Sequence, residues 1–293
     1  MEKIKRTAKW IEKAMNLLFL ACGLLTILFV ILITIFLVIS GIPAIRKIGL
    51  GDFLFGREWL STAARPSYGI LPFILTSVYG TSGAILIGVP IGILCAIFLA
   101  KMSPKKVGSL VRNVVDLLAG IPSVVYGLLG MIIIVPCVRE LFHLPDGANL
   151  FSAILVLAVM ILPSVISVSE TAIKAVPKEY EEASLALGAT KTETVFKVVV
   201  PAAKSGIVTA VVLGIGRAVG EAMAVMMVAG NVANMPKLFG SVRFLTTAVA
   251  SEMSYSSGLQ RQALFSIALV LFLFIMAINL ILTAIIKKGE KND

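Results

Sequence analysis

Hydrophobic residues along the chain are gathered in six long stretches separated by shorter polar segments. Each stretch is long enough to cross the hydrocarbon core of a membrane, which is about 30 Å thick and needs roughly 20 residues of helix. The predicted transmembrane helices cover residues 15–40, 70–100, 107–138, 151–173, 205–230 and 263–286. The first stretch follows a basic segment, as a signal sequence does, but it is far longer than the roughly 7 to 15 apolar residues of a signal core. We therefore predict an uncleaved membrane anchor.

This pattern predicts an all-α polytopic membrane protein with six transmembrane helices. Residues 1–69 are expected to form a cytoplasmic N-terminus, the first transmembrane helix and a long external loop. Residues 70–286 are expected to form a core of five helices with a cytoplasmic loop at 174–204, and residues 287–293 a cytoplasmic tail. The composition agrees, because 58% of the residues are hydrophobic and only 14% are charged, whereas soluble domains are roughly half apolar and a quarter charged.

The 26 Lys and Arg residues lie mostly on one side of these predicted helices. They are concentrated before residue 14, at 101–112, in the loop 174–204 and after residue 286. Because short loops rich in Lys and Arg stay in the cytoplasm, we predict a multi-pass protein of the cell membrane with both termini cytoplasmic. The net charge of +10 then reflects orientation in the membrane, and no nucleic-acid partner is expected.

Cysteine and histidine give no sign of a metal site, and none is predicted. Cys22, Cys95 and Cys137 lie in or at the ends of apolar stretches and form no C-x-x-C pair. The single histidine, His143, falls in a short outer loop. The sequence also contains neither H-E-x-x-H nor G-x-S-x-G. We therefore expect no catalytic residues, and we predict that this chain is not itself an enzyme.

The loop between the predicted fourth and fifth helices carries the signals of two short helices. Pro177 and the glutamates that follow it favour a helix start, and Gly188 favours a helix end with a positive φ. Thr190 and Glu193 match the capping box of a second helix, which Pro201 is expected to end. Two helices joined by a glycine elbow on the cytoplasmic side would form a platform for docking a partner.

The spacing within this loop is its most specific feature. A glutamate and two small residues are followed, at fixed distances, by a glycine and an apolar segment that ends in proline: Glu182-Ala183-Ser184, Gly188 and Val198-x-Val200-Pro201. This pattern resembles the E-A-A-x3-G-x9-I-x-L-P loop of ABC importer permeases. The resemblance implies that Glu182, Ala183 and Gly188 dock on a separate ATPase subunit, which uses ATP and Mg, while this chain binds no cofactor. Consistently, the chain has no G-x4-G-K-[ST] phosphate loop. The alternative is an amphipathic loop that packs on its own helix ends.

Three further segments are similar to the C-type permease subunits of phosphate importers. They are GIPSVVYGLLG at 120–130, ILPSVISVSETAIKAVP at 161–177 and GRAVGEAMAV at 216–225. The similarity implies the type I permease fold of ABC importers, an A-type permease as the other half of a heterodimer, two ATPase subunits, an external phosphate-binding protein and a surrounding lipid bilayer. Ala222 stands where that family usually has threonine. Import of another oxyanion (sulfate, molybdate or tungstate) is therefore an alternative, and an ion-coupled secondary carrier is a less favoured one.

Two charged residues, Arg217 and Glu221, interrupt the apolar run of the predicted fifth helix. With a rise of about 1.5 Å per residue, a helix that enters the membrane at Ser205 places them about 18 and 24 Å along its axis, near mid-membrane. A charge there costs roughly 2.5 to 3.5 kcal/mol and usually faces a bundle interior or a water-filled path. Since guanidinium donates to phosphate through a planar fork, we predict that both residues line a substrate path. The alternative is a simple charge pair on a helix that packs through Gly216 and Gly220.

Pro122 and the polar residues of the predicted fourth helix are weaker candidates for the same path. Pro122 removes a helical hydrogen bond at membrane depth, and broken helices there usually line a cavity or are buried in protein. We predict a helix break near the path, with a plain proline kink as the alternative. Ser164, Ser167, Ser169 and Glu170 are polar enough to line a wet interior, although serine also holds transmembrane helices together.

Overall fold

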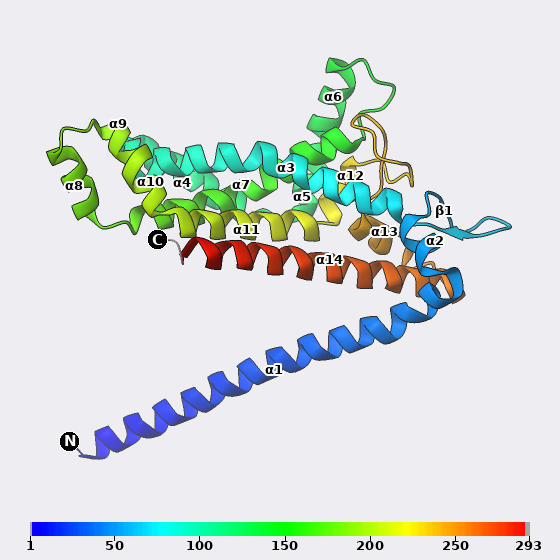
Figure 1. Ribbon diagram of the computed structural model, residues 1–293, viewed down its shortest axis with the longest axis horizontal. Helices are drawn as coiled ribbons and strands as arrows, with labels where there is room; N and C mark the ends of the chain where they lie inside the picture. The colour runs from blue at the N-terminus through cyan, green and yellow to red at the C-terminus, as the bar shows by residue number, and fades with distance from the viewer. Residues whose placement is uncertain (1, 291–293) are drawn as a thin grey trace.

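The computed structural model describes the backbone of residues 2–290 and the side chains of residues 12–281, 283 and 284. Its long helices lie along the long axis of the molecule, and α1 stands apart from the others (Figure 1). The long helices are α1 (Glu2–Ile48), α3 (Leu71–Ile97), α4 (Lys105–Gly120), α7 (Leu150–Lys174), α11 (Lys204–Gly220) and α14 (Gly258–Glu290).

Short elements lie between these helices, some at the ends of the bundle and others within it. Before α7 they are α2 (Leu50–Phe55), β1 (Trp59–Leu60), β2 (Ser67–Tyr68), α5 (Ser123–Leu129) and α6 (Val135–Leu141). After α7 they are α8 (Lys178–Ala186), α9 (Lys191–Thr194), α10 (Val200–Ala202), α12 (Met223–Val228) and α13 (Leu245–Glu252). Three π-helical turns lie between them: η1 (Phe98–Met102), η2 (Gly130–Ile134) and η3 (Val195–Val199).

Among the described residues, five helical segments are long and apolar enough to cross a membrane, and a sixth span forms if one bent pair is counted as a unit. The five are Glu12–Ile48, Leu71–Met102, Ser123–Leu141, Leu150–Lys174 and Gly258–Ile281. The bent pair is Lys191–Ala202 with Lys204–Gly220, at an angle of 70°. The predicted helical membrane architecture is thus confirmed, but the third and fifth predicted helices differ from the structure in detail.

The predicted third helix, 107–138, is divided in two. Ile121 and Pro122 are extended, with ψ of 127° and 144°, so α4 ends before them and α5 begins after them. Proline lacks the N–H of a helical residue and forces the residue before it out of the helical region. The hydroxyl of Tyr126 donates a hydrogen bond of 2.7 Å to the carbonyl of Leu118, which also accepts the N–H of Ile121 at 3.2 Å, so α5 is bonded to the last turn of α4. Pro122 therefore breaks the helix and does not merely kink it.

The predicted fifth helix, 205–230, is also interrupted. Glu221 is extended, with ψ of 129°, so α11 ends just before it and α12 begins two residues later. The hydroxyl of Thr246 donates to the carbonyl of Glu221 at 2.7 Å, and the N–H of Ala224 donates to the Glu221 carboxylate at 2.9 Å. Hydrogen bonds from outside the helix thus replace those that a continuous helix would make.

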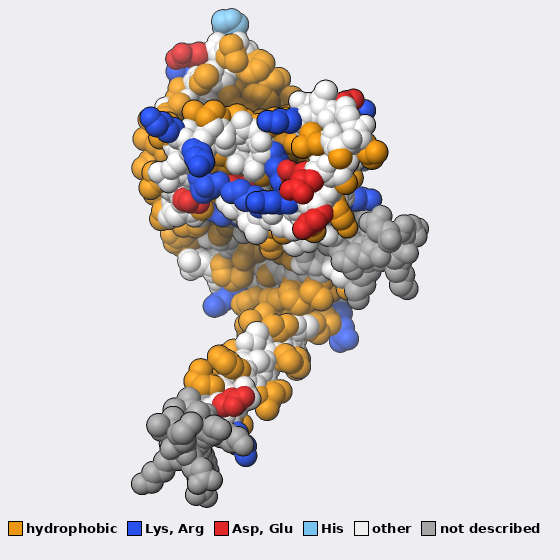
Figure 2. Space-filling model, turned by 90° about the vertical axis from the view of Figure 1, so that its left-hand side faces the viewer, with side chains coloured by type: hydrophobic (Ala, Val, Ile, Leu, Met, Phe, Trp, Pro, Cys, Tyr) orange, Lys and Arg blue, Asp and Glu red, His pale blue; other side chains and the backbone are white. Residues whose placement is uncertain are grey.

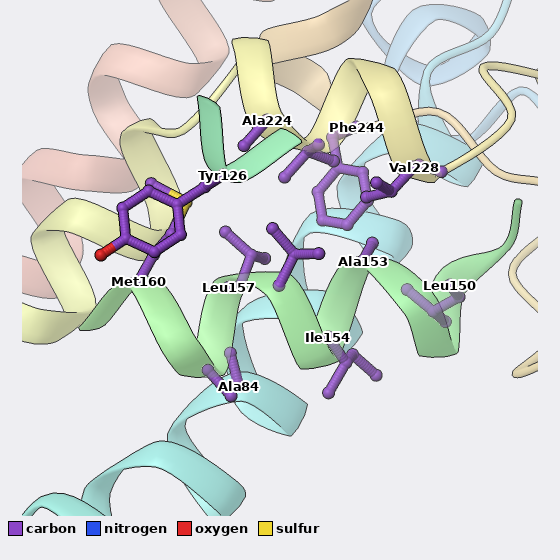
Figure 3. Packing of buried hydrophobic residues seen from close by; sticks show 14 of the residues in the cluster. Ala84, Tyr126, Leu150, Ala153, Ile154, Leu157, Met160, Ala224, Val228 and Phe244 are labelled. Carbon is purple, nitrogen blue, oxygen red and sulfur yellow. The ribbon is translucent and has the colours of Figure 1, made fainter. Parts of the chain in front are cut away.

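Glycines on α3 allow it to pack closely against α7, the central helix of the bundle. A methyl group added at Gly83, Gly88 or Gly92 would come within 2.6 to 2.8 Å of Ile154, Ile161 or Val165 of α7. Such distances are below ordinary carbon contact, so the two helices are interlocked along their length. Figure 3 shows the hydrophobic cluster around α7, which Ala84 of α3 joins on one side and which α5 and α12 cover on the other.

The segment after the first predicted transmembrane helix is more ordered than the long loop expected up to residue 69. α1 continues past Ser40 to Ile48 even though it contains Pro43. The reason is its contact with α14: the hydroxyl of Ser266 donates to the carbonyl of Gly41 at 2.5 Å, and Ala44 is completely buried. The helix α2 and the antiparallel hairpin of β1 and β2 follow.

Trp59 and Tyr68 of the hairpin are buried in a hydrophobic cluster of the bundle, and the polar contacts of the hairpin to the bundle converge on one carboxylate, that of Glu252 at the end of α13. The indole N–H of Trp59 donates to it at 3.2 Å, and the side-chain amide of Gln260 donates to it at 3.0 Å. Arg243 forms an ion pair with the same carboxylate. These contacts join the hairpin, α13 and α14 at the end of the molecule opposite α8 (Figure 1).

Candidate functional site

The loop after α7 forms the two predicted short helices. α8 begins directly after Pro177 and carries glutamates in its first turn. Gly188 has a φ of +87°, as predicted for the elbow. The Thr190 hydroxyl accepts the N–H of Glu193 while the Glu193 carboxylate accepts the N–H of Thr190, which confirms the capping box.

The second short helix ends close to the predicted position. Helix continues through η3 and α10 and ends at Ala202, one residue after Pro201, so the predicted end is confirmed to within one residue. The chain then bends at Ala203 into α11. Buried residues of α3, α7, η3 and α11 pack together beneath this bend: Ala96, Ile97, Ile173, Val176, Val195, Val199, Ala203 and Ile207.

The residues predicted to dock an ATPase are all accessible. Glu182 and Ala183 are exposed on α8, and Gly188 is exposed in the elbow, with open space where a side chain would project. The start of α1 and the end of α14 lie at this same end of the molecule (Figure 1). Figure 2 views this end and shows Lys and Arg side chains gathered across it. The structure thus presents the loop as a protruding part of an end face that is rich in Lys and Arg and also carries acidic side chains.

The structure separates the two charged residues of the predicted fifth helix. Arg217 lies in the last turn of α11, whereas Glu221 lies in the break and caps the first turn of α12. Within residues 12–281, no ion pair joins the two side chains. Both are partly exposed. The alternative of a simple charge pair at positions i and i+4 of one helix is therefore wrong, because the helix ends between them.

The break at Glu221 lies close to the break at Pro122. The short helices that follow the two breaks, α5 and α12, pack tightly, since a methyl group at Gly127 would come within 2.8 Å of the Cα atom of Ala224. Figure 3 shows α12 beside α5 above the side chains of α7. Two interrupted helices therefore meet close to Arg217. In membrane transporters, interrupted helices place irregular backbone beside the substrate.

The surface of α11 around Arg217 is not covered by the described part of this chain. Gly216 and Gly220 are exposed, and a methyl group added at either would meet nothing within 4 Å. The same holds for Gly120, at the end of α4. These glycines consequently do not pack α11 against a neighbour within this chain; they leave an open surface of small residues beside the two breaks.

Glu170 of α7 has a different role from the one considered in the sequence. Ser169 and Glu170 are buried. Glu170 forms ion pairs with Arg112 of α4 and Lys174 of α7, so it joins two helices instead of lining a wet interior. The sequence offered a weak signal for Lys174, which is four residues from Glu170, and none for Arg112, which is 58 residues away.

Comparison with known proteins places this chain among membrane transport components. Residues 88–290 match the model of a family described as binding-protein-dependent transport system inner membrane component. The chain is 40% identical to a probable ABC transporter permease protein, YqgH, of Bacillus subtilis, over 88% of this chain and 87% of that protein. It is 35% identical to the phosphate transport system permease protein PstC of Pasteurella multocida, over 83% and 81% of the two chains, and 33% identical to that of Haemophilus influenzae, over 96% and 95%.

Solved structures with a similar fold are also transporter components. A bacterial alginate ABC transporter, in complex with its alginate-bound periplasmic protein, aligns with a TM-score of 0.61 over 94% of this chain and 95% of that chain, at 16% identity. The MetNI methionine ABC transporter, in an inward-facing conformation, aligns with a TM-score of 0.57 over 75% and 94%, at 21% identity. At these identities the likeness concerns the fold alone.

Proposed function

Because this chain belongs to the family of binding-protein-dependent transport system inner membrane components, we propose that it is the permease subunit of an ATP-driven ABC importer that carries inorganic phosphate across the cell membrane by alternating access. The permeases for phosphate to which it is similar cover most of its length. The observation that carries the choice of an anion is Arg217, a guanidinium at membrane depth beside two helix breaks, with no carboxylate bonded to it among residues 12–281.

Phosphate needs such a residue because it is a small, strongly hydrated anion without an apolar part. It crosses the membrane only where protein groups replace its water, and a guanidinium offers two parallel N–H donors that match two phosphate oxygens. Glu221, which lies in the break after α11, would act as a gate, because its negative charge repels the anion. Sulfate, molybdate and tungstate share the charge and the tetrahedral shape, so they are the competing cargoes.

A second permease, of the A type, would close the path. The uncovered face of α11, with Gly216 and Gly220, and the nearby Gly120 allow another chain to approach closely. The anion would then pass between the two permeases, where Arg217 is partly exposed, after delivery by an external phosphate-binding protein. This arrangement explains why a charged side chain lies at the edge of the chain and not in its core.

The energy would come from two separate ATPase subunits, which use ATP and Mg. Their docking site would be α8 and the elbow, with Glu182, Ala183 and Gly188 exposed toward them. The lysines and arginines at the same end of the molecule favour a cytoplasmic location for this end, and hence for both termini. A reporter fused after Lys288 should be cytoplasmic, and one inserted near Arg57 should be external; the opposite result would overturn this orientation.

The test is uptake by the complex of both permeases, the ATPase and the binding protein, reconstituted in lipid vesicles. We expect ATP-dependent uptake of labelled phosphate that excess sulfate or molybdate does not reduce. Stronger competition by either anion would reassign the cargo. Uptake should persist when ionophores collapse ion gradients while ATP is held constant, and its loss would favour an ion-coupled carrier instead.

A further inference from the structure

The docking helix α8 stands almost clear of the rest of the protein. None of its residues is buried, and it projects from the end of the bundle (Figure 1). Among the described side chains, two polar contacts join it to other elements. Ser184 and Thr194 share a hydrogen bond of 2.9 Å between their hydroxyls, and Glu181 forms an ion pair with Lys101. The first contact stays within the loop, whereas the second reaches the end of α3.

The ion pair between Lys101 and Glu181 is shielded from water. The Lys101 side chain is 16% exposed and that of Glu181 27%, so solvent and salt screen their attraction less than at an open surface. A useful contrast lies in the same loop, where Lys197 pairs with Glu193 one helical turn away, and these side chains are 74% and 46% exposed. Both pairs join a lysine to a glutamate, so comparing them separates the effect of a long-range ion pair from that of a local one.

Without the contact to Lys101, α8 would be held mainly at its two ends. Its first residue follows Pro177, and its last turn leads into Gly188, whose positive φ and open surroundings leave no side chain to resist a change of angle. A helix held at two ends can rotate about the line that joins them. The side chain of Glu181 projects from α8 to one side of that line. Its ion pair with Lys101 therefore fixes the tilt of α8 relative to α3.

Lys101 belongs to a group of helices that is tightly interlocked. It lies in η1, the π-helical turn that ends α3. α3 packs on α7 through Gly88 and Gly92, and a methyl group at Gly214 of α11 would lie 3.0 Å from the same Val165 that faces Gly92. Close-packed helices transmit displacement with little compression. A displacement at Lys101 therefore acts on the set of helices that carries Arg217.

We propose that Lys101 is a coupling residue, whose ion pair with Glu181 braces the docking helix against α3 so that movement of the ATPase reaches the helices of the substrate path. This inference rests on the proposed function, because it assumes that α8 is the docking helix. Lys101 is a positioning residue; it touches neither the anion nor the nucleotide. Its loss should leave ATP hydrolysis running while transport fails to follow.

The experiment compares four versions of the full complex in lipid vesicles: wild type, Lys101→Met, Lys197→Met and the exchange Lys101→Glu with Glu181→Lys. The measured quantity is the number of anions taken up per ATP hydrolysed, alongside co-purification of the ATPase. We expect Lys101→Met to lower this ratio by about fivefold or more, within the range of measured coupling between sites. Lys197→Met, which removes the same charge from an exposed pair, should retain the wild-type ratio, and the exchange should recover most of it.

A wild-type ratio in Lys101→Met, or an equal loss in Lys197→Met, would overturn the proposal. If Lys101→Met fails to assemble, Glu181→Gln takes its place, and a wild-type ratio there has the same meaning. Failure of the proposed function looks different: the wild-type complex would then take up no phosphate. If it takes up another oxyanion, the phosphate assignment is wrong, and the ratio for that anion tests Lys101 instead.

Discussion

The hydroxyl of Thr246 donates a hydrogen bond of 2.7 Å to the backbone carbonyl of Glu221, and this bond joins the first turn of α13 to the break after α11. On the other side of the break, the Glu221 carboxylate accepts the N–H of Ala224 at 2.9 Å. Glu221 is thus held through both its backbone and its side chain. Its carboxylate has a structural task as a helix cap in addition to the part proposed for it in transport.

Substitution of Glu221 by glutamine should separate these two tasks. Glutamine keeps a side-chain oxygen that can accept the N–H of Ala224, so the complex should assemble with an unchanged melting temperature while uptake falls. Glu221→Ala should lose the cap as well, at a cost of about 1 kcal/mol in the free energy of unfolding. Thermal unfolding, gel filtration and initial uptake rates check both variants. Normal uptake by Glu221→Gln would reduce this residue to a cap.

Removal of the guanidinium of Arg217 should abolish uptake without disturbing assembly. Arg217→Gln keeps a helix-compatible side chain with hydrogen-bonding atoms but has no charge for the anion, and Arg217→Lys keeps the charge but loses the planar fork. We expect no uptake in the first variant and an intermediate rate in the second, measured with labelled phosphate. Arg261→Gln, which removes an exposed arginine at the start of α14, serves as the control and should transport normally. If Arg217→Gln transports as well as this control, the path does not pass Arg217.

Substitutions at Gly188, in the elbow, should be tolerated according to how readily the new residue adopts a positive φ. Its φ of +87° is unfavourable for every residue with a Cβ, most of all for a β-branched one, although nothing within 4 Å would touch the added atom. Gly188→Val should therefore weaken co-purification of the ATPase and reduce ATP-dependent uptake. Gly188→Asn should retain more of both, because asparagine enters this backbone region more readily. Equal behaviour of the two variants would mean that the angle at the elbow does not matter for docking.

The interlock between α3 and α7 should be sensitive to a single methyl group. Gly88→Ala would bring a Cβ within 2.8 Å of the Ile161 side chain and 2.9 Å of the Ala158 carbonyl oxygen, which belongs to the backbone and cannot move aside cheaply. We expect a loss of roughly 1 to 3 kcal/mol in stability, as for other overpacked sites. Gly23→Ala, on α1 with nothing within 4 Å, should lose none. The melting temperatures of the two purified variants give the comparison, and similar values would argue against close packing at Gly88.

Local signals in the sequence were sufficient to predict the conformation of the docking loop. The conformation of Gly188 and the capping box of Thr190 and Glu193 depend on neighbouring residues only, so their pattern predicted the structure that forms. The break at Pro122 was predicted for the same reason, because proline acts on its own backbone and on the residue before it.

Contacts between distant residues could not be predicted in this way. Arg217 and Glu221 interrupt the apolar run, but no neighbouring residue predicts that the helix stops at Glu221, and a hydrogen bond from Thr246, 25 residues away, helps to hold the break. Lys101 and Glu181 are 80 residues apart. The extension of α1 to Ile48 likewise depends on its packing against Ser266 of α14. Hydrophobic periodicity identifies segments that enter the membrane, but tertiary contacts decide where a helix stops.

The length of α11 has a consequence for the lipid around it. Its 17 residues rise by about 26 Å, which is less than the roughly 30 Å of an average hydrocarbon layer. A short helix is accommodated when the bilayer thins locally, at a cost that increases with each ångström of mismatch. In this protein the remaining length comes instead from the break at Glu221 and the short helix α12 that follows it, so the segment can reach across an average bilayer because it is interrupted and not simply ended.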